Sequence, residues 1–225
     1  MWKKSGPSSG GPQGQGGQGG SPSLDANGNQ QGAKDRIYTF SNAPVPIKRQ
    51  PPVAFTLPNG KTHWYEAVYL PKGGINWVQC KALAEEAGGY MVTLHSDEEN
   101  DFVFSLIEDE KFWFKWDSSH NYVMNGPFIG GFKPKGSPSG KSGWKWVSGE
   151  PWDYSKWCRD GLPGDRDPRP NNQPNDSTGN SDIIAYGEIN VPVKYWGDFP
   201  HKFSSYNDTH EGGSYGFIIE YESKP

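Results

Sequence analysis

The sequence predicts an α+β domain with two helices, small antiparallel sheets and one long polar loop. Three observations favour this class. Two segments place helix-capping residues before apolar residues at helical spacing, and several short segments have the pattern of strands. Residues 153–182 are rich in Pro, Asn, Asp and Gly and almost without aliphatic side chains. Together these features describe an α+β protein with one unusually long loop.

Composition limits the class of protein and of partner. The 225 residues are only 32% hydrophobic but 14% aromatic, so a core built on aromatic rings is expected in one domain with an appendage. The net charge of -4 and the lack of a basic run argue against nucleic acid as a partner. The apolar runs are too short to cross a membrane, and no conventional signal peptide is visible.

The N-terminal region divides into two parts by composition. Residues 1–33 are mostly Gly, Gln, Ser, Pro and Asn, which bury too little apolar surface to offset their ordering entropy. We therefore expect a low-complexity tail that is disordered when alone, or is held by a neighbouring subunit. Residues 34–58 contain five prolines and predict an extended lead-in, so the folded domain is placed at residues 59–225.

The first part of the domain predicts a hairpin, a strand and a helix. Asn59-Gly60 is a hairpin-turn signal, and residues 63–70 follow it as a strand. Asn76 caps a helix that begins at Trp77 and ends at Gly88-Gly89. Its predicted buried face is Trp77, Cys80, Ala84 and Ala87.

A second helix and several strands follow. The helix opens on the capping box of residues 96–99. Its predicted buried stripe is Phe102, Val103, Leu106 and Ile107. Three further strands are predicted at residues 90–94, 128–131 and 215–222.

Four of the ten tryptophans fall within residues 144–157. Trp144 and Trp146 alternate along a strand and therefore point to the same face. Because strand aromatics usually bury, we expect these two and Trp152 to pack in the core and the loop base, with Glu150 as a structural hydrogen-bond partner. The long polar loop that follows is of a kind that is uncommon unless it binds something, so the ligand site is expected there.

Seven segments, in one order, resemble the C-type lectin-like domain. They are residues 77–89, 94–103, 128–131, 144–152, 173–175, 196–198 and 216–220. Each segment alone is weak evidence, but the seven in register cover about residues 60–223. The resemblance implies a C-type lectin-like fold in which the long polar loop is the binding loop.

The resemblance also implies a calcium site. In this family a Glu-Pro-Asn or Gln-Pro-Asp triplet in the loop and a later Asn-Asp pair chelate Ca²⁺, which then ligates two vicinal sugar hydroxyls. A cis bond before the loop proline directs the two flanking side-chain carbonyls to one ion. Carried onto this chain, the metal ligands are Gln173, Asn175, Asp182 and Asp198. The residues expected to contact a ligand are Gln173, Asn175, Asp176, Ser181 and Asp198.

The chain departs from the family pattern at this site. Gln173-Pro174-Asn175 is a hybrid of the two family triplets, Ser181 stands where a glutamate is usual, and Gly197 replaces the usual Asn before Asp198. Because calcium affinity rises with carboxylate count, the site is expected to be weakened or rearranged, and calcium binding stays open. Asn207-Asp208 is a secondary candidate pair. The hybrid triplet indicates neither a mannose-type nor a galactose-type preference.

The cysteines differ from the family as well. Its usual bridge positions hold other residues here, in the pairs Ala84 with Ile219 and Ile183 with His201. This favours a microbial or phage member of the family. Cys80 and Cys158 either form one non-standard bridge or remain two free thiols.

The sequence predicts a binding module rather than an enzyme. Its five histidines show no i, i+4 metal pair, and no nucleophile motif is present. The expected partner is a glycan or another cell-surface ligand. The expected location is outside the cell, on a cell surface or on a virion surface, and whether Ca²⁺ is a cofactor stays open. The alternative is a structural or protein-binding module of a larger assembly, anchored to neighbouring subunits through residues 1–58, with the calcium site lost.

Overall fold

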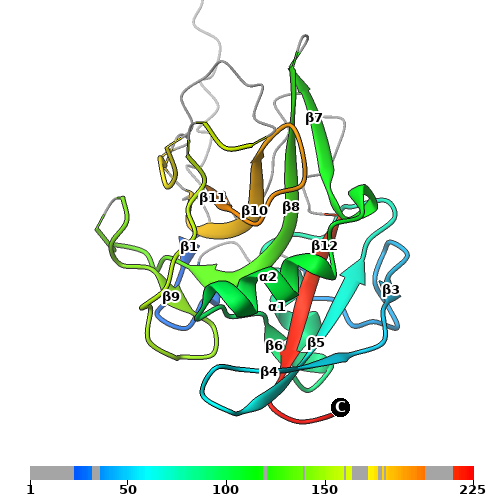
Figure 1. Cartoon of the computed structure of the whole chain (residues 1–225). Helices are drawn as coiled ribbons and strands as arrows, with labels where there is room; N and C mark the ends of the chain where they lie inside the picture. The colour runs from blue at the N-terminus through cyan, green and yellow to red at the C-terminus, as the bar shows by residue number, and fades with distance from the viewer. Residues whose placement is uncertain are drawn as a thin grey trace, which may run out of the picture.

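In the part of the chain that the structure describes, two α-helices and a short 3-10 helix accompany a branched sheet of ten strands (Figure 1). The computed structural model describes residues 23–31, 36–118, 121–138, 140–159, 161–163, 172–176, 179, 181–200 and 215–225. The candidate pair Asn207-Asp208 lies outside these residues. Among the helices of the described ranges, none combines the length and the apolar character that a membrane span needs.

The sheet strands are β3 (Lys48–Arg49), β4 (Val53–Thr56), β5 (Thr62–Tyr69), β6 (Tyr90–Met91), β7 (Phe114–Ser118), β8 (Asn121–Phe132), β9 (Lys145–Trp146), β10 (Ile183–Ile189), β11 (Trp196–Phe199) and β12 (Gly216–Tyr221). Their main order is β11-β10-β8-β12-β5-β3, and β4, β6, β7 and β9 branch from it. Only β12 and β8 pair in parallel, through Phe217 and Phe128, among the described strands. This parallel contact joins β12 and β5 to β8, β10 and β11 within the same sheet.

The first helix, α1 (Trp77–Glu86), confirms the predicted cap. The Asn76 side chain accepts from the Gln79 N–H at 3.1 Å, and the Gln79 side chain accepts from the Asn76 N–H at 3.0 Å. This reciprocal pair satisfies two N–H groups that the first helical turn leaves unbonded. Trp77, Cys80 and Ala84 are fully buried as predicted, whereas Ala87 is half-buried.

The second helix, α2 (Asp97–Ser105), has one half of the predicted capping box. Ser96 Oγ accepts from the Glu99 N–H at 3.2 Å, but Glu99 Oε2 accepts from His95 N–H instead of Ser96. Val103 and Ile107 are buried and the other two predicted stripe residues are half-buried. Glu99 is itself fully buried, and its Oε1 accepts from the Tyr65 hydroxyl at 2.6 Å, which compensates for the lost contact with water.

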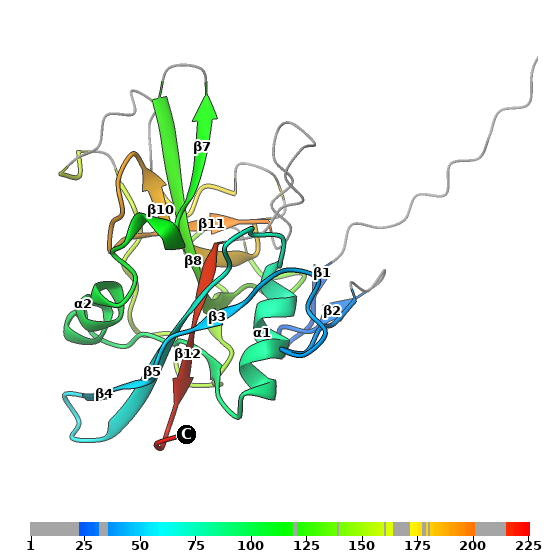
Figure 2. The same cartoon turned by 90° about the vertical axis from the view of Figure 1, so that its right-hand side faces the viewer.

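Part of the low-complexity N-terminal segment belongs to the folded body. Residues 23–31 form the hairpin of β1 (Ser23–Leu24) and β2 (Gln30–Gln31), next to α1 (Figure 2). Asp25 Oδ1 accepts from the N–H groups of Asn27 and Asn29, and Leu24 is fully buried in the core. The buried Leu24 and the hydrogen bonds within the turn therefore order residues 23–31. Residues 1–22 lie outside the described part of the chain.

The core lies on both sides of β5 and β12, with α1 and α2 on opposite sides (Figure 2). Alternate residues of β12 show this division. Phe217 and Ile219 pack in the cluster that contains α1 residues, whereas Ile218 packs in the cluster that contains Val103 of α2. The second cluster also contains the buried tryptophans below the long loop, so the loop starts from a rigid base.

Candidate functional site

The loop triplet is fixed at both ends by backbone hydrogen bonds. Its Gln173–Pro174 peptide bond is cis. The Gln173 N–H donates to the Cys158 carbonyl at 3.0 Å. On the other side, the Asp198 carboxylate accepts from Asn175 N–H through Oδ1 at 2.8 Å and from Asp176 N–H through Oδ2 at 2.9 Å. The triplet is therefore held between the strand residue Asp198 and the segment that contains Cys158.

Asp176 closes the tight turn that follows. Its φ is +45°, a left-handed conformation that aspartate adopts more readily than most residues. Its Oδ1 accepts from the Ser181 N–H at 2.9 Å, and its carbonyl accepts from the Gly179 N–H at 3.0 Å. Four of the predicted site residues, Asn175, Asp176, Ser181 and Asp198, are thus joined in one hydrogen-bonded unit.

The remaining two predicted residues take different positions. Gln173 is buried, with 3% of its surface exposed. Asp182 directly precedes β10: its N–H donates to the Phe199 carbonyl at 3.0 Å, and its own carbonyl accepts from the Lys133 N–H at 2.7 Å. Asn175, by contrast, is an exposed residue.

Lys133 is a site residue that the sequence analysis missed. It follows the end of β8, and its ammonium lies 4.6 Å from the centre of the Trp144 ring while donating to the Gly140 carbonyl at 2.8 Å. Burial lowers the pKa of Lys133, and the charges of Asp198 and Asp176 act in the opposite direction. Lys133 is thus a cation on which the charges of the two loop carboxylates act.

Burial also governs Asp198, which is 4% exposed. Desolvation raises the pKa of its carboxyl, and the hydrogen bonds that it accepts from the N–H groups of Asn175 and Asp176 partly counter this shift. The carboxylate is therefore an internal acceptor for the loop backbone rather than a solvent-facing group.

The carboxylates of the loop are engaged by its own backbone. Calcium takes six to eight oxygen ligands, most effectively from several carboxylates. Here both Asp198 oxygens and one Asp176 oxygen accept backbone N–H groups. Within the described ranges, no group of three or more His, Cys, Asp or Glu side chains is suited to a metal ion. A calcium ion bound at these carboxylates would share their oxygens with the backbone N–H groups of the loop.

The tryptophans of residues 144–157 form the base of the loop, as predicted. Trp144 and Trp146 are 4% and 2% exposed, and Trp152 is half-buried against them, with its ring centre 4.4 Å from that of Trp146. Glu150 is a structural partner: its Oε2 lies 2.9 Å from His95 Nε2 and accepts from Ser148 Oγ at 3.3 Å. These contacts connect the loop base to the segment before α2.

The two cysteines are free and buried. Cys80 packs in the cluster of α1, whereas Cys158 packs in a small cluster with Leu162, Ile189 and Val193. Burial raises the pKa of the Cys80 thiol well above its ordinary value. Of the two alternatives open from the sequence, the structure has two free thiols and no Cys80–Cys158 bridge.

Comparison with known proteins agrees with this architecture. The low affinity immunoglobulin epsilon Fc receptor of Mus musculus is 31% identical over 83 residues, which are 37% of this chain and 23% of the receptor. Rheacalcin-2 of Rhea americana is 24% identical over 91 residues, 40% of this chain and 59% of that protein. Both are C-type lectin-like proteins. This chain contains a C-type lectin-like domain. No family model matches it, and the matches span less than two thirds of either relative's own length.

Three solved structures are similar to this C-type lectin-like domain. The cow C-type carbohydrate-recognition domain of CD23 is 18% identical, with a TM-score of 0.42 over 70% of this chain and 86% of that chain. A calcium-independent type II antifreeze protein is 19% identical, with a TM-score of 0.43 over 75% and 95%. The herring type II antifreeze protein is 19% identical, with a TM-score of 0.42 over 70% and 89%.

Proposed function

We propose that the C-type lectin-like domain is a non-enzymatic module that binds carbohydrate through the loop of residues 172–176, without calcium. The Asp198 clamp carries this proposal. It holds the backbone of Asn175 and Asp176 in place and leaves the Asn175 side chain exposed. The site of action is outside the cell, on a cell surface or on a virion surface.

The chemistry of the loop suits a hydroxyl-rich ligand. A side-chain amide donates two hydrogen bonds and accepts through its oxygen, so Asn175 can satisfy a sugar hydroxyl in both directions. A loop already fixed by its own hydrogen bonds loses less entropy on binding than a mobile one. The ligand class comes from the family resemblance of the loop, and the ion-free mode comes from the engaged carboxylates.

A glycan array probed with the full chain, with calcium and with EDTA, tests this proposal. We expect the same glycans to bind in both conditions. The variant Asn175→Ala should weaken binding about tenfold, because a lost hydrogen bond to a ligand hydroxyl costs roughly 1 kcal/mol or more. Asn27→Ala, which removes an exposed amide from the β1–β2 hairpin, is the matched control.

Two outcomes contradict the proposal in different ways. If no glycan binds in either condition, the carbohydrate ligand is wrong. If EDTA abolishes binding, the ion-free mode is wrong and the Asp198 clamp has to open for calcium.

The second candidate is a structural or protein-binding module of a larger assembly. It is favoured by the hairpin of residues 23–31, which packs next to α1 through Lys81 Nζ and Asn29 Oδ1 at 3.3 Å. The body thus already includes residues 23–31, β3 and β4, and an anchoring role falls to residues 1–22. Sedimentation of the full chain and of a chain lacking residues 1–22 separates the candidates: loss of an oligomer on truncation supports the assembly role.

A further inference from the structure

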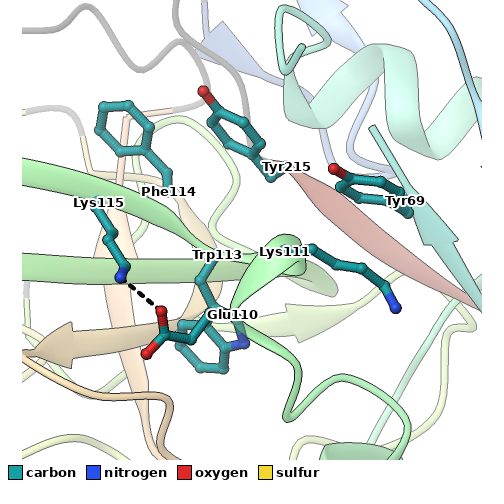
Figure 3. A pocket seen from close by; sticks show the side chains of 7 residues that line it. All are labelled: Tyr69, Glu110, Lys111, Trp113, Phe114, Lys115 and Tyr215. Carbon is teal, nitrogen blue, oxygen red and sulfur yellow. Dashed lines mark hydrogen bonds and ion pairs between the residues drawn. The ribbon is translucent and has the colours of Figure 1, made fainter. Parts of the chain in front are cut away.

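A pocket of about 410 Å³ lies where η1 (Glu110–Phe112) and the ends of β5, β7 and β12 meet (Figure 3). None of its residues belongs to the long loop. Its volume lies within the range of small-molecule sites. The lining residues are Tyr69, Glu110, Lys111, Trp113, Phe114, Lys115 and Tyr215.

Aromatic rings form one part of the lining. Phe114 and Tyr215 stack with their ring centres 5.9 Å apart and their planes 21° apart, and both are half-buried. Figure 3 shows them beside each other, with the Lys115–Glu110 pair next to Trp113. The pocket therefore offers flat apolar surfaces that solvent reaches.

The indole below these rings is rigid. Trp113 is 3% exposed, and its Nε1–H donates to the Ile107 carbonyl at 2.7 Å. Gly126 makes room for this ring, because a Cβ at that position would lie 2.6 Å from it. Because the Trp113 side chain is already fixed, it loses little conformational entropy when a ligand binds in the pocket.

Charged side chains form the other part, and their charges cancel. Lys115 Nζ pairs with Glu110 Oε2 at 2.5 Å, and Lys111 Nζ pairs with Asp109 Oδ2 at 2.8 Å. Two cations and two anions leave no net attraction for an ionic ligand. The same groups place hydrogen-bond donors and acceptors beside the rings.

We propose that this pocket is a second carbohydrate contact, for one or two rings of a neutral oligosaccharide. A sugar ring has an apolar C–H face, which suits the Phe114–Tyr215 surface, and a hydroxyl edge, which suits the Glu110–Lys115 pair. The proposal rests on the proposed function, because it takes carbohydrate as the ligand class. It adds a binding surface outside the family's loop.

Calorimetry with the full chain tests the pocket. The probe is the tightest-binding member of an array of neutral mannose, galactose and N-acetylglucosamine oligomers. Tyr215→Ala should weaken binding about tenfold, since a ligand loses an aromatic surface, and Tyr215→Phe should stay within about threefold. Tyr38→Ala removes a half-buried tyrosine that does not line the pocket and serves as the control. Thermal melts establish that each variant folds.

The outcomes separate this inference from the proposed function. If the wild-type chain binds no neutral glycan, both are overturned. If Asn175→Ala weakens binding while Tyr215→Ala and Tyr215→Phe leave it unchanged, only the pocket proposal is overturned. If Tyr215→Ala weakens binding and Tyr215→Phe does not, the pocket proposal is supported whatever Asn175→Ala does.

Discussion

Asp198 uses both carboxylate oxygens to hold the backbone of the loop. Replacing it by alanine leaves the N–H groups of Asn175 and Asp176 without these acceptors. We expect Asp198→Ala to lower the free energy of unfolding by about 1–3 kcal/mol, the usual cost of such unsatisfied donors. Urea unfolding measures this change.

The control for this prediction lies in the same loop. Asn175→Ala keeps the backbone N–H that Asp198 accepts and changes an exposed residue, so its free energy of unfolding should stay within about 0.5 kcal/mol of wild type. Equal stabilities for Asp198→Ala and Asn175→Ala would show that the clamp contributes nothing measurable.

His63 and Glu220 form a buried pair, with Nδ1 and Oε1 2.6 Å apart and side chains 8% and 1% exposed. The hydrogen bond to Glu220 raises the pKa of His63 above its ordinary 6.5 despite burial, and the charges of Glu220, Glu99 and Glu150 act in the same direction. A raised histidine pKa stabilises the folded state fully below the unfolded pKa. That contribution is lost as pH rises through the folded pKa.

We therefore expect the free energy of unfolding to decrease as pH rises above about 6.5, until His63 is neutral. The variant His63→Gln should lack this decrease. Urea unfolding at a series of pH values from about 6 to 9 measures both slopes. An unchanged slope in His63→Gln would assign the pH dependence to other groups.

At the scale of elements, α1 depends on its reciprocal cap. Asn76→Ala removes the acceptor for the Gln79 N–H and should cost about 1 kcal/mol of unfolding free energy, as N-cap losses usually do. Asn76→Ser keeps a capping oxygen and should recover most of this loss. Chemical unfolding of the two variants gives the comparison, and a serine variant as unstable as the alanine variant would contradict the capping role.

At the scale of the whole molecule, the groups that fix the long loop belong to the chain itself. Because the hydrogen bonds of Asp198 and Asp176 close the loop without an ion, about 5 mM CaCl₂ should shift the melting temperature by less than about 1 °C. Thermal melts with calcium and with EDTA measure this. A rise of several degrees that EDTA reverses would mean that calcium binds the folded state.

The sequence by itself determined the parts that depend on neighbours along the chain. The caps at Asn76 and Ser96 accept from N–H groups three residues on, so local spacing was enough to predict where both helices begin. The order of seven short segments along the chain predicted the C-type lectin-like fold. Burial of Trp144 and Trp146 was predicted correctly, although β9 spans only Lys145–Trp146 and Trp144 lies just before it.

Only the tertiary structure decided what the site residues do. Asp198 and Asn175 are 23 positions apart, and the sequence shows which oxygens are available but not whether they face an ion or a backbone N–H. Likewise, nothing near Glu99 in the sequence indicates the Tyr65 hydroxyl that donates to it in the fold. Hydrogen-bond partners and burial depend on distant segments brought together, and they determine whether a carboxylate holds a loop or a metal.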